Sequence, residues 1–159
     1  MVARMDTREH LNRVLGEIQQ GLALDADGEC AIETSDGDEV LVSVSDDTDQ
    51  AVVSIPVANL RGDEREEMLE EALVINDDLT LTGPSRICYS REHDMLLLRY
   101  AVDGETIESA ELEAVIVAVL ELAEPIRDHL LSGGALEADA ESDTVDPPDG
   151  EFPPGSIRA

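Results

Sequence analysis

Acidic residues and three histidines are the side chains of this sequence that could support chemistry. The carboxylates cluster in short turn-like segments at 25–29, 36–39 and 46–49 and at the starts of predicted helices. Catalytic carboxylates normally converge in an apolar pocket that shifts their pKa values, whereas carboxylates in turns are usually solvated. The histidines, His10, His93 and His129, match no zinc-binding HxxxH or HExxH spacing, so we expect surface or capping roles for them. The sequence therefore predicts a protein that is not an enzyme.

Two segments resemble ligand-binding loops, and both lack residues that such loops require. DADGEC at 25–30 begins like a calcium loop, but its sixth position is Cys30 instead of Gly and its twelfth is Asp36. Gly133 and Gly134 follow the last predicted helix and lack the Lys and Ser/Thr of a phosphate-binding loop. We expect no metal and no cofactor.

The net charge restricts the partners. The formal charge is −28, from 38 acidic and 10 basic residues, and all ten basic residues are Arg. Phosphate backbones and anionic membranes are bound by neutralising them with Lys and Arg, so direct nucleic-acid binding and membrane docking are not expected. Neutral or basic partners are favoured, although solubility, a salt-adapted host or steering toward a basic partner each explain such acidity.

Targeting signals and aromatic residues are both scarce. The N-terminus MVARMDTREH does not resemble a signal peptide, and no apolar stretch approaches the roughly 18 residues of a membrane helix, which predicts a cytoplasmic protein without membrane insertion. Aromatic residues make up 2% of the chain, which argues against a stacking platform.

Cys30 and Cys88 lie in strand-like runs, where a small buried side chain is the usual role; a disulfide or a metal pair is the alternative.

The first half of the chain predicts a helix followed by a meander. Residues 6–20 have helical apolar spacing, with Asp6 and Glu9 placed as a capping box and Gly21 at the end. Alternating segments that start at Leu22 and Leu24 then continue through 30–32, 40–44 and 51–57, separated by turns, and Pro56 is expected to end the last strand.

The second half predicts a helix, a hairpin and a long helix. A helical pattern covers 63–76, strand character returns at Leu79 and Leu81, and 86–90 pairs with 95–102. Ser109 is the expected N-cap of a helix over 109–131, which we expect to kink or restart at Pro125. Residues 133–159 are rich in Gly, Pro and acids and are predicted to be disordered.

These elements predict an α+β fold at 1–132 in which helices cover a twisted antiparallel sheet. Exposed strand edges and apolar grooves of such folds bind polypeptide segments. Another protein chain is therefore the favoured ligand.

The element order, the small size and the low isoelectric point resemble the class I chaperones of bacterial type III secretion, the Tir-chaperone family. LALDADGECAIETSDGDEVLVSV at 22–44 is similar to the family's opening sheet. LTGPSRICYSREHDMLLLRYAVDGETIESAELEAVIVAVLELAEPIRDHL at 81–130 is similar to its hairpin and closing helix. The resemblance covers about 6–132, without the tail and with Pro125 as a departure, and extends to the general chaperones of plant-pathogenic bacteria.

The resemblance implies a homodimer that binds the N-terminal segment of effector proteins in non-globular form and delivers it to the secretion ATPase. A regulatory binding protein of the same fold, which sequesters an anti-activator or a regulator, is the alternative. A third possibility is an acidic DNA mimic, whose binding would collapse with salt.

Candidate contact residues follow from the same resemblance. The candidates for client binding are the apolar face of the first helix and the early strands: Leu11, Val14, Leu15, Ile18, Leu22, Leu24 and Ile32. The helical stripe alone equally fits a core role. The candidates for the dimer interface are Met68, Leu69, Leu73, Leu79 and Leu81.

Overall fold

The computed structural model describes residues 6–45, 47–60 and 62–132, and the predicted disordered tail at 133–159 lies outside these residues. The elements run in the order α1 (Thr7–Ile18), β1 (Glu29–Glu33), β2 (Glu39–Val44), β3 (Gln50–Asn59), α2 (Arg65–Asp77), α3 (Leu79–Thr82), β4 (Arg86–Ser90), β5 (Met95–Asp103) and α4 (Ser109–Leu131). One antiparallel sheet holds the strands in the order β1-β2-β3-β5-β4. The predicted α+β fold with a meander and a hairpin is confirmed.

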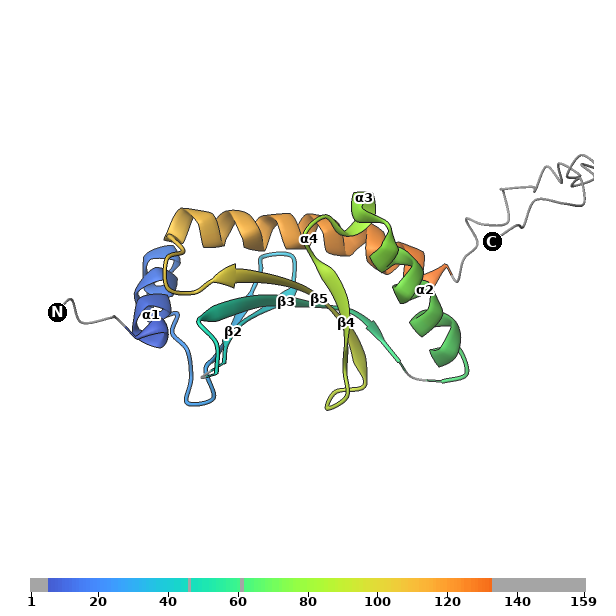
Figure 1. Ribbon diagram of the computed structural model, residues 1–159, viewed down its shortest axis with the longest axis horizontal. Coiled ribbons are helices and arrows are strands. Elements are labelled where there is room, and N and C mark those ends of the chain that lie inside the picture. The colour runs from blue at the N-terminus through green and yellow to red at the C-terminus, as the bar shows by residue number, and fades with distance from the viewer. Residues whose placement is uncertain (1–5, 46, 61, 133–159) are drawn as a thin grey trace, which may run out of the picture.

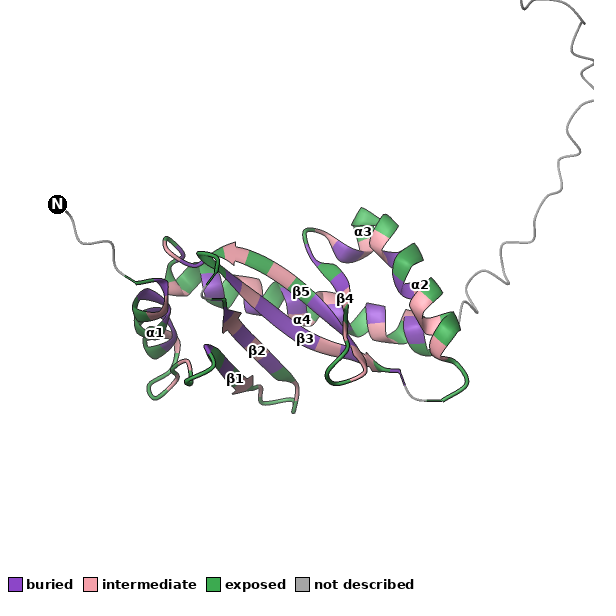
Figure 2. Cartoon of the chain, turned by 60° about the horizontal axis from the view of Figure 1, so that its bottom comes forward, coloured by how far each residue is buried: buried purple, intermediate pink, exposed green. Residues whose placement is uncertain are grey.

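The helices lie on one face and at the ends of the sheet (Figure 1). α4 runs along the sheet above β3 and β5, α1 packs near the N-terminal end of α4, and α2 lies beside β4. The side chains between α4 and the sheet form the apolar core; they include Val53, Ile55, Leu98, Val119 and Ile126. None of the described helices lies on the other face of the sheet (Figure 2).

Asp6 is the N-cap of α1, and its carboxylate accepts a hydrogen bond from the Arg8 backbone N–H at 3.4 Å. His10 is buried, which differs from the expected surface role. Its Nε2 lies 2.8 Å from the carbonyl oxygen of Ile107, and its Nδ1 lies 3.1 Å from the Arg13 guanidinium. These two contacts tie α1 to the segment before α4.

α4 continues through Pro125 as one helix, so the expected restart at this residue is wrong. Proline removes the N–H that would bond the carbonyl of Glu121. Both residues lie on the exposed side of the helix, where water can satisfy that carbonyl. The start of α4 also differs from the prediction: Glu108 is the N-cap and forms a capping box with Glu111, while Ser109 is the first helical residue.

Pro56 lies inside β3 and does not end it. β3 is a central strand that extends to Asn59, and its pairing with β5 shifts between Pro56 and Ala58. Proline is tolerated within a sheet at such an irregularity because one ladder hydrogen bond is already lost there. Arg127 of α4 donates to the Pro56 carbonyl at 2.9 Å and pairs with Asp38 at 2.9 Å, which fixes this part of the sheet against α4.

Two predicted strand segments are not strands. Leu22 and Leu24 lie in the connection between α1 and β1, where the Leu24 N–H donates to the Asn12 side chain at 2.7 Å instead of to a neighbouring strand. Leu79 and Leu81 lie in α3, which Asp78 caps by accepting from the Thr80 N–H at 2.9 Å. The local capping interaction outweighs a two-residue alternation, which is too short to specify a strand.

Candidate functional site

An apolar groove of about 370 Å³ lies on the face of the sheet that α4 does not cover. We call it the sheet groove. The residues that line it come from the loop before β1, from four strands and from the β4–β5 turn: Asp25, Glu29, Ala31, Glu39, Leu41, Ser54, Pro56, His93, Met95 and Leu97. Apolar side chains therefore form its floor, and carboxylates and one histidine lie at its margins.

The sheet groove exists because several strands carry apolar residues on both faces. Side chains alternate between the two faces of a strand. In β2, Val40 and Val42 are buried on the side of the helices, and Leu41 between them is also apolar and lines the groove. In β5, Leu96 and Leu98 are buried in the same way, and Leu97 between them lines the groove. Runs of consecutive apolar residues, VLV at 40–42 and LLL at 96–98, are the sequence signal for this second apolar face, and the sequence reasoning missed it.

β1 is an edge strand, and among the described residues no strand pairs with its outer side. The hydrogen bonds that flank the β1–β2 ladder, from Val44 N to Gly28 O and from Thr34 N to Asp38 O, are both 2.9 Å long. In an antiparallel ladder, every second residue of a strand bonds to its neighbour. In the register of β1 with β2, the backbone groups of Ala31 and Glu33 therefore point away from β2. Those groups can pair with an added strand.

The opposite edge, β4, is closed by α2. The side chain of Asn76 donates to the carbonyl of Ile87 at 3.0 Å and accepts from its N–H at 2.8 Å. These are the backbone groups that another strand would use. β1 is therefore the accessible edge of the two.

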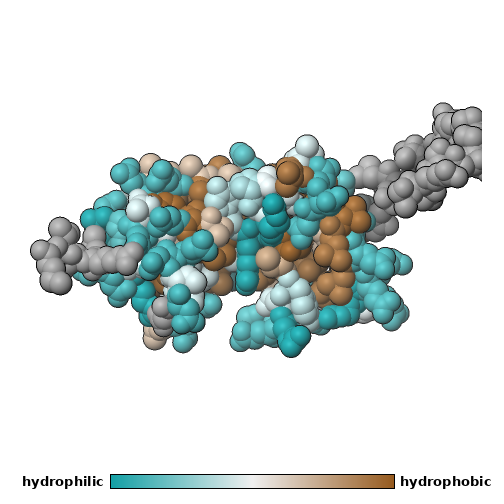
Figure 3. Space-filling view, viewed as in Figure 1, coloured by the Kyte–Doolittle hydropathy of each residue, from teal (hydrophilic) through white to brown (hydrophobic). Residues whose placement is uncertain are grey.

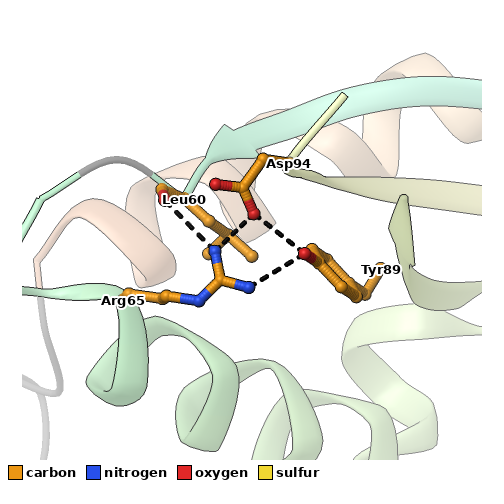
Figure 4. A network of polar contacts seen from close by, with 4 residues as sticks. All are labelled: Leu60, Arg65, Tyr89 and Asp94. Atoms are coloured by element: carbon orange, nitrogen blue, oxygen red, sulfur yellow. Dashed lines mark hydrogen bonds and ion pairs between the residues drawn. The ribbon is translucent and has the colours of Figure 1, made fainter. Parts of the chain in front are cut away.

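A polar network fixes the start of α2 against the β4–β5 turn (Figure 4). Arg65 pairs with Asp94 and donates to the Tyr89 hydroxyl at 2.9 Å, and that hydroxyl lies 2.9 Å from the Asp94 carboxylate. The guanidinium also lies over the Tyr89 ring, 5.2 Å from its centroid. Asp94 and Tyr89 raise the pKa of Arg65, because both hydrogen-bond to its charged form.

A second apolar surface lies on α2 and α3. Leu73, Val74 and Leu79 expose 71%, 57% and 63% of their area, which is unusual for large apolar residues of one small domain. Figure 3 shows hydrophobic side chains gathered along α2 and on α3. We call these three residues, together with Met68, Leu69 and Leu81, the α2–α3 patch.

The predicted client-binding residues divide into two groups. Leu11, Val14 and Leu15 expose at most 1% of their area and belong to the core, so their side chains are not available to a partner in this chain. The other four are partly buried and pack against the core: Ile18, Leu22, Leu24 and Ile32. None of these residues lines the sheet groove.

The predicted dimer residues all lie in the α2–α3 patch. Leu73 and Leu79 are exposed, whereas Met68, Leu69 and Leu81 are partly buried against the core. The structure therefore brings the five residues together on two consecutive helices, although Leu79 and Leu81 arrive there from a helix and not from a strand.

The two cysteines have different environments. Cys30 is buried, as expected, and burial raises the pKa of its thiol. Cys88 is only partly buried and lies on β4 opposite Leu97. Both are free thiols, so the disulfide alternative is wrong for this structure.

Of the helices among the described residues, none combines the length and the apolar character needed to cross a bilayer.

Comparison with solved structures identifies similar folds. A chain in the crystal structure of the ExsC–ExsE complex is 17% identical, with a TM-score of 0.65, over 79% of this chain and 97% of its own length. A chain of the HopA1–SchA chaperone–effector complex is 12% identical, with a TM-score of 0.60, over 77% of this chain and 96% of its own. The Yersinia pestis type III secretion chaperone SycH, in complex with a fragment of YscM2, gives 16% identity and a TM-score of 0.54 over 76% and 99%.

Sequence comparison assigns the family. No curated protein sequence matches the chain. The family model of the Tir chaperone protein (CesT) family matches residues 9–127, which is most of the chain and includes β1 to β5, the whole of α2 and α3, and most of α1 and α4. The chain therefore belongs to the Tir chaperone protein (CesT) family.

Proposed function

We propose that this member of the Tir chaperone family is a type III secretion chaperone that binds the N-terminal segment of effector proteins in non-globular form in the bacterial cytoplasm. The observation that carries the proposal is the sheet groove beside the open edge of β1. An extended chain needs main-chain partners and sites for alternate apolar side chains, and this face offers both. The HopA1–SchA complex, a chaperone bound to an effector, has a chain of similar fold and supports the proposal.

Binding of this kind holds a client without folding it. A segment that orders on binding loses conformational entropy, which offsets part of the apolar contact energy and keeps the complex reversible. Reversibility suits a carrier that must release its client at the secretion ATPase, which is the partner we propose for delivery.

We also propose that the α2–α3 patch forms the interface of a homodimer. A two-fold interface places the same patch of both subunits in contact. The exposed Leu73, Val74 and Leu79 suit such an interface because fully buried interface centres are more apolar than the surrounding surface.

Co-expression of the tagged full-length chain with N-terminal segments of candidate effectors, followed by pull-down in about 1 M salt, tests client binding. The Debye length is then about 3 Å, so charge attraction between exposed groups is screened while apolar contacts persist. A complex that survives supports the proposal. Capture only at low salt supports a charge-mimic role, and capture of a regulator but of no secreted client supports the regulatory alternative.

Leu41→Asp tests whether the sheet groove is the site. Leu41 is half-buried in the groove floor, and a carboxylate there removes an apolar contact worth about 1.5–3 kcal/mol, so affinity should fall about 10- to 100-fold. Val117→Asp is the matched control, because Val117 is 49% exposed on α4 outside the groove. Equal affinity of both variants, each with a native circular dichroism spectrum, would place the client elsewhere.

A further inference from the structure

Acidic side chains line the β1–β2 side of the sheet groove. Glu29 and Glu39 line it directly, and Glu33 lies opposite Glu39 in the strand pairing. All three are exposed, and their carboxylates take part in no hydrogen bond or ion pair among the described residues. Like charges directly opposite each other on neighbouring strands are unfavourable. A cation supplied by a partner would relieve that repulsion.

Basic side chains lie on the same face at the other side of the sheet. Arg99 of β5 pairs with Ser54, which lines the groove, and with Arg86 of β4, which lies directly opposite it. Arg86 donates to the carbonyls of Gly83 and Ser85, but none of the hydrogen bonds or ion pairs among the described residues involves the Arg99 guanidinium. The open face therefore changes sign from β1–β2 to β5–β4.

The width of the sheet determines how long a client segment must be to reach both the carboxylates and the arginines. Four strand spacings separate β1 from β4, about 19 Å at roughly 4.8 Å each. An extended chain covers that distance with about six residues. A stretch of this length that crosses the strands, next to the client residues that pair with the edge of β1, can place its apolar side chains on the groove floor and still have one end near the carboxylates and the other near the arginines.

We propose that the sheet groove selects client segments by charge and direction as well as by apolar content. A preferred segment carries Lys or Arg beside its apolar residues at the end over Glu29 and Glu39, and no basic residue at the end near Arg99. This inference rests on the proposed client binding and adds its specificity. The net charge of −28 would attract any basic segment, but it does not explain a preferred direction.

The test is selection of random 20-residue segments, displayed on phage, with the immobilised full-length chain. Captured segments should be enriched in apolar residues and about threefold or more in Lys and Arg on one side of the apolar residues. In a variant with Glu29→Arg and Glu39→Arg, that enrichment should disappear or change to Asp and Glu, because each exposed charge pair changes affinity by up to about fivefold.

A matched variant separates local charge from net charge. Glu113→Arg with Glu121→Arg changes the net charge equally, at exposed positions of α4 outside the groove, and should select the same segments as the unmodified chain. The inference is overturned if the two variants shift the selection equally, or if the groove variant selects unchanged segments. If the unmodified chain captures no segment, the proposed client binding itself fails.

Arg99→Glu tests direction. Arg99 is exposed, so the fold should be unaffected. Basic residues should then be accepted on both sides of the apolar residues of the captured segments. If the basic residues stay on one side, Arg99 does not set direction, and the directional part of the inference is wrong.

Discussion

At the scale of single residues, two glycines differ in what surrounds them. A Cβ added at Gly104 would lie 2.8 Å from the Thr7 methyl group and 2.9 Å from the carbonyl oxygen of Asp49. That carbonyl also accepts the Gly104 N–H at 2.8 Å, so the backbone cannot move away without losing the bond. Gly16 lies on the exposed side of α1, and a Cβ there would meet no atom within 4 Å.

Alanine substitutions at these two positions should have opposite effects on the free energy of unfolding. Gly104→Ala should lower it by about 1–3 kcal/mol because the added methyl group overpacks the junction of α1 and β5. Gly16→Ala should raise it by about 0.5–1 kcal/mol because alanine loses less conformational entropy in a helix. Urea unfolding followed by circular dichroism measures both, and equal effects of the two substitutions would contradict the packing at Gly104.

The cysteines should differ in reactivity toward a thiol reagent such as DTNB at pH 8. Cys88 is partly exposed and should react quickly, whereas Cys30 is 5% exposed with a raised pKa and should react only when the protein opens. In Cys88→Ser the fast phase should disappear. A fast phase that remains in Cys88→Ser would show that Cys30 is accessible.

The raised pKa of Cys30 also predicts how stability changes with pH. The folded state favours the neutral thiol, so this contribution to stability is fully present below the unfolded-state pKa of about 8.5 and is lost as the pH rises through the folded-state value. The free energy of unfolding should therefore fall more between pH 8 and pH 10 in the unmodified chain than in Cys30→Ala. Equal losses in the two proteins would contradict the raised pKa.

At the scale of elements, the sequence predicted the long periodic segments correctly, but two alternations of only two apolar positions were wrongly predicted as strands. The apolar stripe of α4 extends over many positions, so packing against the sheet fixes it as a helix despite Pro125. Leu79 and Leu81 have only two alternating positions, and the cap from Asp78 decided their conformation. The stripe of α1 fitted either core or client surface, because periodicity shows that a face is covered but not what covers it.

Pro125→Ala should stabilise α4. Alanine restores the N–H that can bond the Glu121 carbonyl and removes the clash of the proline ring with the preceding turn, so the free energy of unfolding should rise by about 1–3 kcal/mol. Ala118→Pro, at another exposed position of α4, is the reciprocal variant and should lower it by about 3 kcal/mol or more. Thermal unfolding measures both; a destabilised Pro125→Ala would show that the proline is required where it stands.

At the scale of the whole molecule, sequence reasoning could not locate the sheet groove. Most of its residues come from four strands, and only the register between those strands brings Leu41, Pro56 and Leu97 to one face. Alternation within one strand indicates two faces but not which residues of other strands share them. The proximity of the residues predicted for the dimer interface was easier to foresee, because these residues are close in sequence and lie on two consecutive helices.

Because the α2–α3 patch is exposed in the single chain, it provides the sharpest test of assembly. Leu73→Asp should leave the fold intact, since Leu73 is 71% exposed, but should place one carboxylate from each subunit inside an apolar two-fold interface. Light scattering should therefore give the mass of a monomer for Leu73→Asp and the mass of a dimer for the unmodified chain. Val117→Asp, an apolar-to-acidic change at a 49% exposed position outside the patch, should keep the double mass. An unmodified chain of single mass would remove the dimer proposal and leave the patch free for a different partner. If Leu73→Asp keeps the double mass, the dimer forms through another surface.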